Sequence, residues 1–314
     1  MIDVETAPNS NLTANLRTNM NLKHGIPSAE EVCDEVKAEG TNDGTRVKSL
    51  TKLAPFILMH IACFAVLFVG VGLGAALLCV GLYALRMFAL TAGYHRYFSH
   101  RSYKTNRVVQ FLLALLGTTA VQKGPLWWAA HHRRHHKYSD QEGDVHSPVQ
   151  AGLWWSHVGW IVSAKSDPTD WDAIKDFARF PELRWLNKWH LLPPIALAVG
   201  LFMLGGWQWL VWGFFVSTVA LYHGTFSVNS LSHVWGSRRF ATSDQSRNNF
   251  LIALWTGGEG WHNNHHHYMA SVKQGFYWWE VDFSYYVLKM MSWIRLVSDL
   301  RVPPKHLLAA ERLS

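Results

Sequence analysis

The sequence predicts an all-α integral membrane protein in which four transmembrane helices form two hairpins beneath a cytosolic helical cap that holds a metal site. Three observations lead to this fold class. Only 16% of the 314 residues are charged and 14% are aromatic, whereas soluble domains carry roughly 25% charge. Two long stretches contain no charged residue at all, and most histidines cluster just outside them.

Residues 1–48 are rich in Asn, Thr, Asp and Glu and poor in aromatic residues, so they lack the apolar surface that an ordered segment must bury. The start MIDVETAPNS has no basic segment followed by an apolar one, unlike a cleaved signal peptide. We expect a disordered cytosolic tail over residues 1–48, followed by one membrane domain over residues 49–314.

The two uncharged stretches run from residue 53 to 85 and from 189 to 237. A helix needs about 20 apolar residues to cross the hydrocarbon core of a bilayer. Each stretch is therefore expected to hold two crossings joined by a tight turn, at Gly70-Val71-Gly72 and at Gly205-Gly206. The predicted transmembrane helices are 55–69, 73–91, 191–204 and 207–228.

Basic residues flank both hairpins, whereas the two short turns carry no charge. The flanking residues are Arg46, Lys48, Lys52, Arg96, Arg101, Lys104, Arg107, Arg184, Lys188, Arg238 and Arg239. Because positive loops stay on the cytoplasmic side, both termini and the intervening polar segments are expected in the cytosol, at the inner membrane if the protein is bacterial. This distribution explains much of the net charge of +7 without nucleic acid, for which no binding module is recognisable.

Two further apolar stretches, 111–121 and 285–296, are too short or too mixed to span a membrane. They are expected to be helices that lie in the interface or pack under the membrane hairpins. With the polar segments between the hairpins, they would make up the cytosolic cap.

Eleven of the 18 histidines fall in four segments at one predicted depth: HRYFSH, HHRRHH, NSLSH and HNNHHH. On a helix, the first, fourth and fifth residues of HxxHH lie within an arc of about 100°. His132, His135 and His136 can therefore direct their imidazoles to one point, and so can the triplet at 262, 265 and 266. His95 and His100 are expected to straddle the end of the second crossing, and Asn229 and His233 share one helix face.

Neutral imidazoles bind Fe, Cu, Zn and Ni, and the lack of thiolates argues against a structural zinc site. Nine candidate ligands are too many for one ion and enough for two. For a single HxxHH motif, ordinary surface or core histidines remain an equal alternative, but four clusters at one depth favour metal. His131 and His267 are expected beside the ligands or at the interface. The isolated histidines are taken as ordinary residues: His24, His60, His146, His157, His190, His223 and His306.

The four segments resemble the three histidine boxes and the additional histidine of the membrane fatty acyl desaturases. The similarity extends to TAGYHRYFSHRSYK, GPLWWAAHHRRHHKYSD, DVHSP, SHVGW and GEGWHNNHH, and covers roughly residues 51–304. The form looks most similar to bacterial delta-9 desaturases of the stearoyl-CoA desaturase type. The resemblance implies four crossings, a cytosolic cap and a nine-histidine di-iron centre.

Carried over to this sequence, the resemblance implies nine iron ligands: His95, His100, His132, His135, His136, His233, His262, His265 and His266. Asn229 would hold a water on one metal. Asp140, Asp144 and Glu259 are candidate carboxylates that orient imidazoles through their second N–H. Three residues of the second crossing are a hypothetical floor of the substrate tunnel, with plain helix packing as the alternative: Cys79, Tyr83 and Met87.

The resemblance implies an O2-dependent oxidoreductase with two Fe2+ ions that introduces a cis double bond at C9 of a saturated fatty acyl chain. The alternative is a membrane hydroxylase of acyl chains or alkanes from the same histidine-box superfamily. A membrane haem or metal carrier would place its histidines inside the crossings, whereas these lie beyond the predicted helix ends. A structural adaptor has no use for nine convergent histidines.

The acyl carrier and the electron donor stay open. Animal acyl-CoA desaturases carry Arg-Asp where this chain has Ala130-His131, and a downstream basic pair is reduced to Ala164-Lys165. CoA, phospholipid and ACP therefore all remain candidate carriers. No HPGG motif of a fused cytochrome b5 occurs, so a separate ferredoxin or flavin reductase is expected. Its docking surface could be formed by three arginines, which could equally be positive-inside charges: Arg238, Arg239 and Arg247.

Overall fold

The structure, a computed structural model, describes residues 43–308. The compact unit that carries all the features discussed below begins at Lys48. Residues 43–48 of the predicted tail form the first turns of a helix, and the rest of that tail lies outside the described residues.

Three helical segments of the described chain are long and apolar enough to cross a membrane: Thr51–Val69, Leu73–Ser99 and Leu192–His233. The first comprises α3 (Asp43–Cys63) and α4 (Val66–Val69), and the second comprises α5 (Leu73–Phe88) and the π-helix η1 (Ala89–Ser99). The third comprises α12 (Leu192–Trp209), η4 (Leu210–Val216), α13 (Ser217–Ser230) and η5 (Leu231–His233). The second segment continues past its predicted end at Thr91, because η1 extends the helix into the cap.

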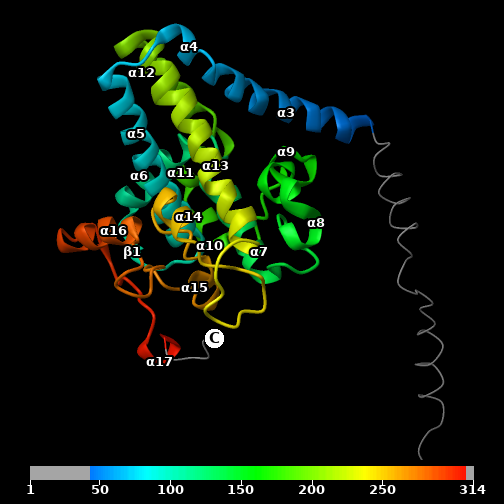
Figure 1. The fold of residues 1–314 in the computed structure, drawn as a ribbon, viewed down its shortest axis with the longest axis vertical. Coiled ribbons are helices and arrows are strands. Elements are labelled where there is room, and N and C mark those ends of the chain that lie inside the picture. The colour runs from blue at the N-terminus through cyan, green and yellow to red at the C-terminus, as the bar shows by residue number, and fades with distance from the viewer. Residues whose placement is uncertain (1–42, 309–314) are drawn as a thin grey trace, which may run out of the picture. The chain divides into compact units, whose positions relative to one another are not determined.

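Glycines end the first segment and interrupt the third where the sequence predicts turns. Gly70 has φ 64° and Gly206 has φ 62°, a left-handed conformation that L side chains rarely adopt. The two interruptions lie in contact, because Gln208 Nε2 donates a hydrogen bond of 3.1 Å to the Val69 carbonyl and Trp212 Nε1 donates one of 2.8 Å to the Gly70 carbonyl. Figure 1 shows α4 and α12 at one end of the bundle and α7 and α15 at the other.

The remaining elements surround the histidines. The helices are α6 (Arg107–Thr118), α7 (Pro125–Tyr138), α8 (Pro148–Trp154), η2 (Trp155–Gly159), α9 (Trp160–Val162), η3 (Ala164–Ser166), α10 (Lys175–Ala178), α11 (Pro181–Lys188), α14 (Phe250–Trp255), α15 (His262–His267), α16 (Phe283–Trp293) and α17 (Lys305–Leu308). Helices α6 and α16 occupy the two stretches predicted to be interfacial helices. One feature departs from an all-helical chain: the short strands β1 (Lys104–Thr105) and β2 (Val297–Ser298) pair antiparallel.

The core that positions the site lies where η1 packs against α6 and α7. Tyr94 and Phe98 of η1 are fully buried there, together with Leu126 of α7. Gly117 lets α6 approach closely, because a Cβ at that position would lie 2.4 Å from the Tyr94 ring. Burial of these large side chains, at about 25 cal/mol per Å2 of apolar area, fixes η1 and α7 relative to each other.

Candidate metal centre

The structure brings together all nine histidines that the sequence singles out, and it divides them into two groups. The first group contains His95, His100, His132, His136 and His265. The second group contains His135, His233, His262 and His266. Within each group, one ring nitrogen of every histidine lies within 4.8 Å of the others. Two compact sets of nitrogen donors therefore lie side by side.

Helices α7 and α15 each contribute to both groups. On α7, the i, i+4 pair His132 and His136 belongs to the first group, whereas His135 belongs to the second. On α15 the assignment is reversed, because His262 and His266 belong to the second group and His265 to the first. The expectation that each triplet is directed to one point is therefore wrong. A 100° arc is wide enough for the i+3 residue to face a different neighbour from the i, i+4 pair.

The other ligand candidates come from helix ends. His95 lies on the π-helix η1 and His100 directly follows that helix, as the sequence predicts. The wider turn of a π-helix often accompanies functional sites, and here it aims His95 at the first group. His233 ends η5, just beyond α13.

Carboxylates accept hydrogen bonds from the Nδ1 atoms of four of the histidines. His135 Nδ1 donates to Asp144 over 2.9 Å, and His233 Nδ1 donates to Asp140 over 2.8 Å. Glu259 accepts from His95 Nδ1 in the same way. All three carboxylates that the sequence suggests thus lie against ring nitrogens on the side away from the group centres. This arrangement fixes the tautomer and leaves each Nε2 as the inward lone pair.

The fourth carboxylate belongs to Asp244, which the sequence analysis does not identify as a partner of a histidine. His266 Nδ1 donates to Asp244 Oδ2 over 2.5 Å. The Asp244 carboxylate also accepts hydrogen bonds from the backbone N–H and the hydroxyl of Ser246. Asp244 lies in a loop between helices with no metal-binding spacing around it, so only the three-dimensional structure reveals its role.

Glu259 is itself positioned by a buried arginine. Arg96 of η1 donates from Nη2 to Glu259 over 2.9 Å and from Nη1 to Asp282 over 2.9 Å. All three side chains are nearly inaccessible to solvent. Removing one partner from a buried ion pair is costly because it leaves an uncompensated charge. The ion pairs of Arg96 therefore hold the Glu259 carboxylate firmly against His95.

The pKa values of the site reflect burial and these pairings. Burial alone would raise the pKa of Glu259, but His95 and Arg96 lower it to about 2. Burial lowers the pKa of His266 to about 4 against the opposing effect of Asp244. Burial, reinforced by neighbouring histidines, lowers the pKa values of several other rings well below the usual value: His100, His132, His136, His262 and His265. Neutral imidazoles beside ionised carboxylates are the protonation states that metal ligation requires.

The contacts between the rings fit bound cations. His265 Nε2 lies 3.0 Å from His95 Nε2 and 2.9 Å from His136 Nε2. His95 already donates its Nδ1–H to Glu259, so its Nε2 carries a lone pair, and one N–H on His265 cannot serve both neighbours. In the second group, the buried Nε2 atoms of His135 and His266 have no hydrogen-bond partner among the described residues. A metal ion in each group would satisfy these nitrogens.

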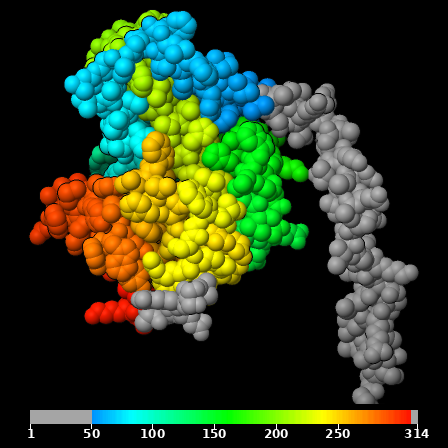
Figure 2. Space-filling model, in the orientation of Figure 1, coloured from blue at the N-terminus to red at the C-terminus, as the bar shows by residue number. Residues whose placement is uncertain are grey.

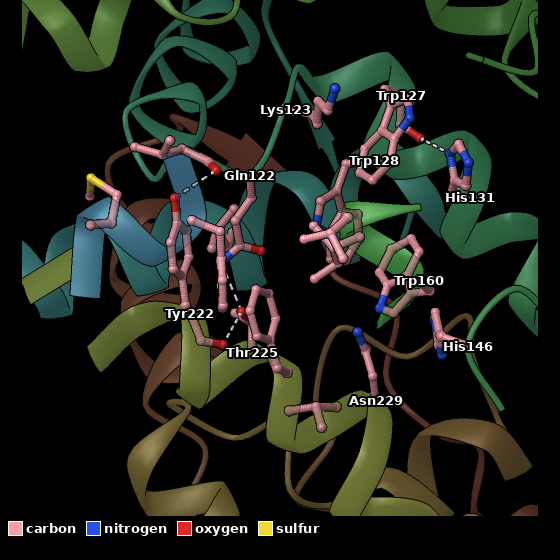
Figure 3. Close-up of a pocket in the computed structure, with 18 of the residues that line it drawn as sticks. Gln122, Lys123, Trp127, Trp128, His131, His146, Trp160, Tyr222, Thr225 and Asn229 are labelled. Carbon is pink, nitrogen blue, oxygen red and sulfur yellow. Dashed lines mark hydrogen bonds between the residues drawn. The ribbon is translucent and has the colours of Figure 1, made fainter. Parts of the chain in front are cut away.

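An apolar cavity of about 860 Å3 reaches the two groups. His95, His132, His262 and Asn229 line its inner end. Figure 3 shows Asn229 and His146 below Trp160 in the view and Trp127 and Trp128 above it, and Trp127 stacks on Trp160 with ring centroids 5.8 Å apart. Asn229 therefore lines the same cavity as ligand candidates of both groups.

The structure separates the three residues of the predicted tunnel floor. Met87 lines the cavity. Tyr83 is not a cavity-lining residue, but it packs next to Met87: a Cβ on Gly224 would lie 2.9 Å from the Met87 methyl and 3.0 Å from the Tyr83 hydroxyl. Tyr83 donates to the Trp255 carbonyl over 2.6 Å. Cys79 is partly buried and does not line the cavity, so Met87 is the one residue of the three that does.

Some histidines taken as ordinary lie in notable surroundings. His146 is buried and stacks on His135 with ring centroids 4.2 Å apart. The DVHSP segment, which belongs to the resemblance, is the signal that could have drawn attention to it. His60, His157 and His223 form a hydrogen-bonded row. His131 donates its Nδ1–H to the Trp127 carbonyl and lines the cavity, whereas His267 stacks on Phe240.

The two arginines within HHRRHH face away from the metal groups. Arg133 pairs with Asp176 over 2.9 Å and also donates to the Phe98 and Ser99 carbonyls. Arg134 donates to the Gly143 carbonyl. The basic character of this segment therefore serves to fix α7 in the cap, and the histidines alone face the site.

Comparison with known proteins decides the family. A family model described as fatty acid desaturase matches residues 56–290, which is most of the chain. The chain belongs to the fatty acid desaturase family. The sn-2 palmitoyl-lipid 9-desaturase of Nostoc sp. (strain 36) is 39% identical over 217 residues, covering 68% of this chain and 76% of that protein.

Other relatives of this desaturase carry different names at similar identity. The palmitoyl-monogalactosyldiacylglycerol delta-7 desaturase of Arabidopsis thaliana is 37% identical over 230 residues, covering 71% of this chain and 61% of that protein. The acyl-CoA C20 Delta5-desaturase of Anemone leveillei is 36% identical over 229 residues, covering 72% and 73%. The protein is thus a membrane-integral fatty acid desaturase and an oxidoreductase, and the hydroxylase alternative is not favoured.

Proposed function

We propose that this desaturase uses two iron ions and O2 to introduce one cis double bond at C9 of a saturated fatty acyl chain. The observation that carries this proposal is the pair of histidine groups, with inward-facing lone pairs, at the inner end of an apolar cavity. Breaking unactivated C–H bonds requires chemistry that no side chain provides, and the bound irons supply it by activating O2.

In the proposed arrangement, the first group of five histidines holds one iron and the second group of four holds the other, with Asn229 contributing through a water. Imidazole donors without thiolates suit iron in an oxygen-dependent enzyme. The carboxylates of Asp140, Asp144, Asp244 and Glu259 act on the metals only through the rings that they orient. These outer contacts raise the basicity of the ligating nitrogens and keep their geometry fixed.

The chain's other task is to hold the substrate. The cavity walls are mostly apolar, so an acyl chain loses contact with water or lipid and gains packing against aromatic and aliphatic side chains. Holding two adjacent methylene groups at the inner end of the cavity lowers the activation free energy, because the reacting groups are already in position. In the balanced reaction, the chain gives up two hydrogens, and O2, two electrons and two protons complete the formation of two waters.

We place four crossings in the membrane, in two hairpins. The non-helical Gly205 and Gly206 divide the 42-residue segment Leu192–His233 into two lengths, and the contact of Gln208 and Trp212 with Val69 and Gly70 supports two adjacent turns. Basic residues flank the opposite end of the hairpins, where the histidines lie. The metal centre and both termini would therefore face the cytosol.

The position of the double bond and the electron donor complete the proposal. Three relatives at 38–39% identity are named 9-desaturases, which supports C9.

Electrons would come from a separate ferredoxin or flavin reductase. Arg238 and Arg239 are already engaged by neighbouring groups, since Arg238 donates to the Asp244 carbonyl and Arg239 pairs with Glu280. Arginines that are engaged within the cap in this way favour the cap's own stability over donor docking.

Expression in a host that lacks unsaturated fatty acids tests this function. Mass spectrometry of the host lipids should locate a new cis double bond at C9, and the matched variant His265→Ala should produce none. A hydroxylated product without an alkene, or a double bond that appears equally with the variant, would contradict the proposal.

A further inference from the structure

The rim of the cavity is apolar and exposed. Of the residues that line the cavity, the histidines of its inner end are buried, whereas Leu58 and Ile61 of α3 and Leu191 before α12 are 61%, 55% and 53% exposed. Residues that both line a cavity and face the surroundings mark its opening. The opening therefore lies along α3 and the start of α12.

This opening lies at membrane level. Leu58 and Ile61 belong to the apolar segment Thr51–Val69, and Leu191 directly precedes the segment Leu192–His233. A large apolar rim of this kind is unfavourable in water, whereas hydrocarbon chains of a bilayer would cover it at no cost. The cavity thus opens sideways into the hydrocarbon region, along the length of a transmembrane helix.

Cationic groups lie at the cytosolic end of the same opening. Lys52 Nζ lies 2.6 Å and Lys123 Nζ 3.2 Å from the carboxylate oxygens of Asp167, and both lysines line the cavity. Two ammonium groups share one carboxylate, which leaves one positive charge in excess. Burial, then Lys123, lowers the pKa of His190 to about 4, so this lining residue is neutral at physiological pH. The excess charge suits an ester or phosphate group at headgroup depth.

A second cavity, of about 450 Å3, is less suited to a polyphosphate. It is lined by Arg134 and Lys165 but also by Asp144 and Asp170, so its charges balance. Neither of these two cavities is therefore strongly basic, as a site for a CoA nucleotide would be. Charge and apolar exposure both favour the sideways opening.

The opposite edge of α3 is fixed to its neighbours. His60 lies 3.0 Å from His223 of α13, and His223 lies 3.0 Å from His157 of η2. Phe56 stacks on Tyr222 and Phe226 along the same edge. Figure 2 shows the blue atoms of α3 beside the green segment that contains α8 and α9, where Lys52 donates to the Ser163 carbonyl. These contacts close this edge of α3, whereas the edge that carries Leu58 stays exposed.

We infer that the acyl chain reaches the metal centre from the bilayer while it is esterified to a membrane glycerolipid. The chain passes over the rim formed by Leu58, Ile61 and Leu191, and the headgroup stays beside Lys52 and Lys123. This inference rests on the proposed function and names its substrate class as acyl lipid, as opposed to acyl-CoA.

Purified, iron-loaded enzyme in vesicles tests the inference. Vesicles of 1-stearoyl-2-oleoyl-phosphatidylglycerol, and separately stearoyl-CoA with vesicles of dioleoyl-phosphatidylglycerol, are supplied with ferredoxin, its reductase, NADPH and O2. We expect desaturation of the esterified stearoyl chain and none of stearoyl-CoA. Leu58→Trp should lower turnover of the lipid by about tenfold, because the larger side chain crowds the opening. Ile57→Trp, about 100° around the same helix and outside the cavity lining, should leave turnover unchanged.

The outcomes separate this inference from the proposed function. Desaturation of stearoyl-CoA alone, or equal turnover by Leu58→Trp and wild type at equal iron content, would overturn lipid entry and leave the desaturase activity standing. If an enzyme that holds iron and accepts electrons converts neither of these substrates nor stearoyl-ACP, the proposed function itself fails. Leu191→Trp provides a second block of the opening in case Leu58→Trp does not insert into membranes.

Discussion

Two sets of histidines in this chain are built on opposite principles. In the metal centre, carboxylates take the outer N–H of four rings and the inner nitrogens face one another at about 3 Å. In the row formed by His60, His223 and His157, the central ring of His223 instead contacts one neighbour through Nε2 and the other through Nδ1. His60 Nδ1 donates to the Phe56 carbonyl, so its Nε2 accepts from His223 Nε2, and His223 Nδ1 accepts from His157 Nε2.

The difference shows that convergence, and not the number of histidines, makes a metal site. The two nitrogens of His223 lie on opposite sides of its ring, so one ion cannot be shared by all three residues of the row. Neutral tautomers satisfy the row internally, as expected of polar groups near lipid. The metal centre leaves nitrogens that no proton arrangement can satisfy. Metal content should therefore depend on the nine clustered histidines and not on the row.

The largest effect is expected for His265→Ala. His265 contacts both His95 and His136 in the first group, so its loss removes a donor and opens a gap beside two others. Desaturation should fall below detection and the iron content of the purified enzyme should drop, while membrane insertion persists. A variant with full activity would show that His265 is not a ligand.

Glu259→Gln should have a smaller effect on the same site. The amide no longer carries the charge that orients His95 and that pairs with Arg96, and loss of such an outer partner costs about 10- to 100-fold in metal affinity or activity. Iron affinity is measured by competition with a chelator. Glu182→Gln is the matched control, because Glu182 pairs with Arg107 at the surface. Equal iron affinity of both variants would contradict the assigned role of Glu259.

Acid should release the metals over a defined range of pH. Burial lowers the pKa of His266 to about 4 from its ordinary value of 6.5. In the metal-free protein, the unfolded chain then binds more protons than the folded one between these values, so the free energy of unfolding falls as the pH drops from about 6.5 to about 4. Iron, which requires neutral rings, should leave toward the lower end of this range, near the pKa of about 4 at which the folded His266 ring binds a proton. Iron content measured after gel filtration at stepwise pH checks this expectation, and full retention at pH 4 would refute it.

The smallest effect is expected for His223→Leu. This change removes the middle of the row and two hydrogen bonds, each of which contributes about 1 kcal/mol to the free energy of unfolding. The variant should unfold at a slightly lower temperature and retain the iron content of the wild type. Loss of iron from this variant would break the distinction between the two sets of histidines.

Sequence reasoning predicted the long apolar helices and the glycine interruptions because charge-free stretches and glycine turns are local properties. Gly70 and Gly206 adopt the left-handed conformation where the turns were expected. The extension of the second helix to Ser99 could not be predicted, because η1 is held by packing against α6 and α7 and by the ion pairs of Arg96 with Glu259 and Asp282. These contacts join residues far apart in the chain.

The ligand candidates were predictable from spacing and resemblance, whereas their division was not. Helical geometry places His132, His135 and His136 within one arc, but only the neighbours His95 and His233 decide which group each joins. Asp244 went unnoticed because its partner His266 lies 22 positions away on another element. Cys79 was misplaced because a crossing has several faces, and its sequence does not show which of them lines the cavity.

The metal content of the purified wild-type enzyme tests the central claim most directly. Inductively coupled plasma mass spectrometry of enzyme purified at neutral pH should give two irons per chain, one for each histidine group. One iron per chain, or zinc in place of iron in an active preparation, would contradict the account.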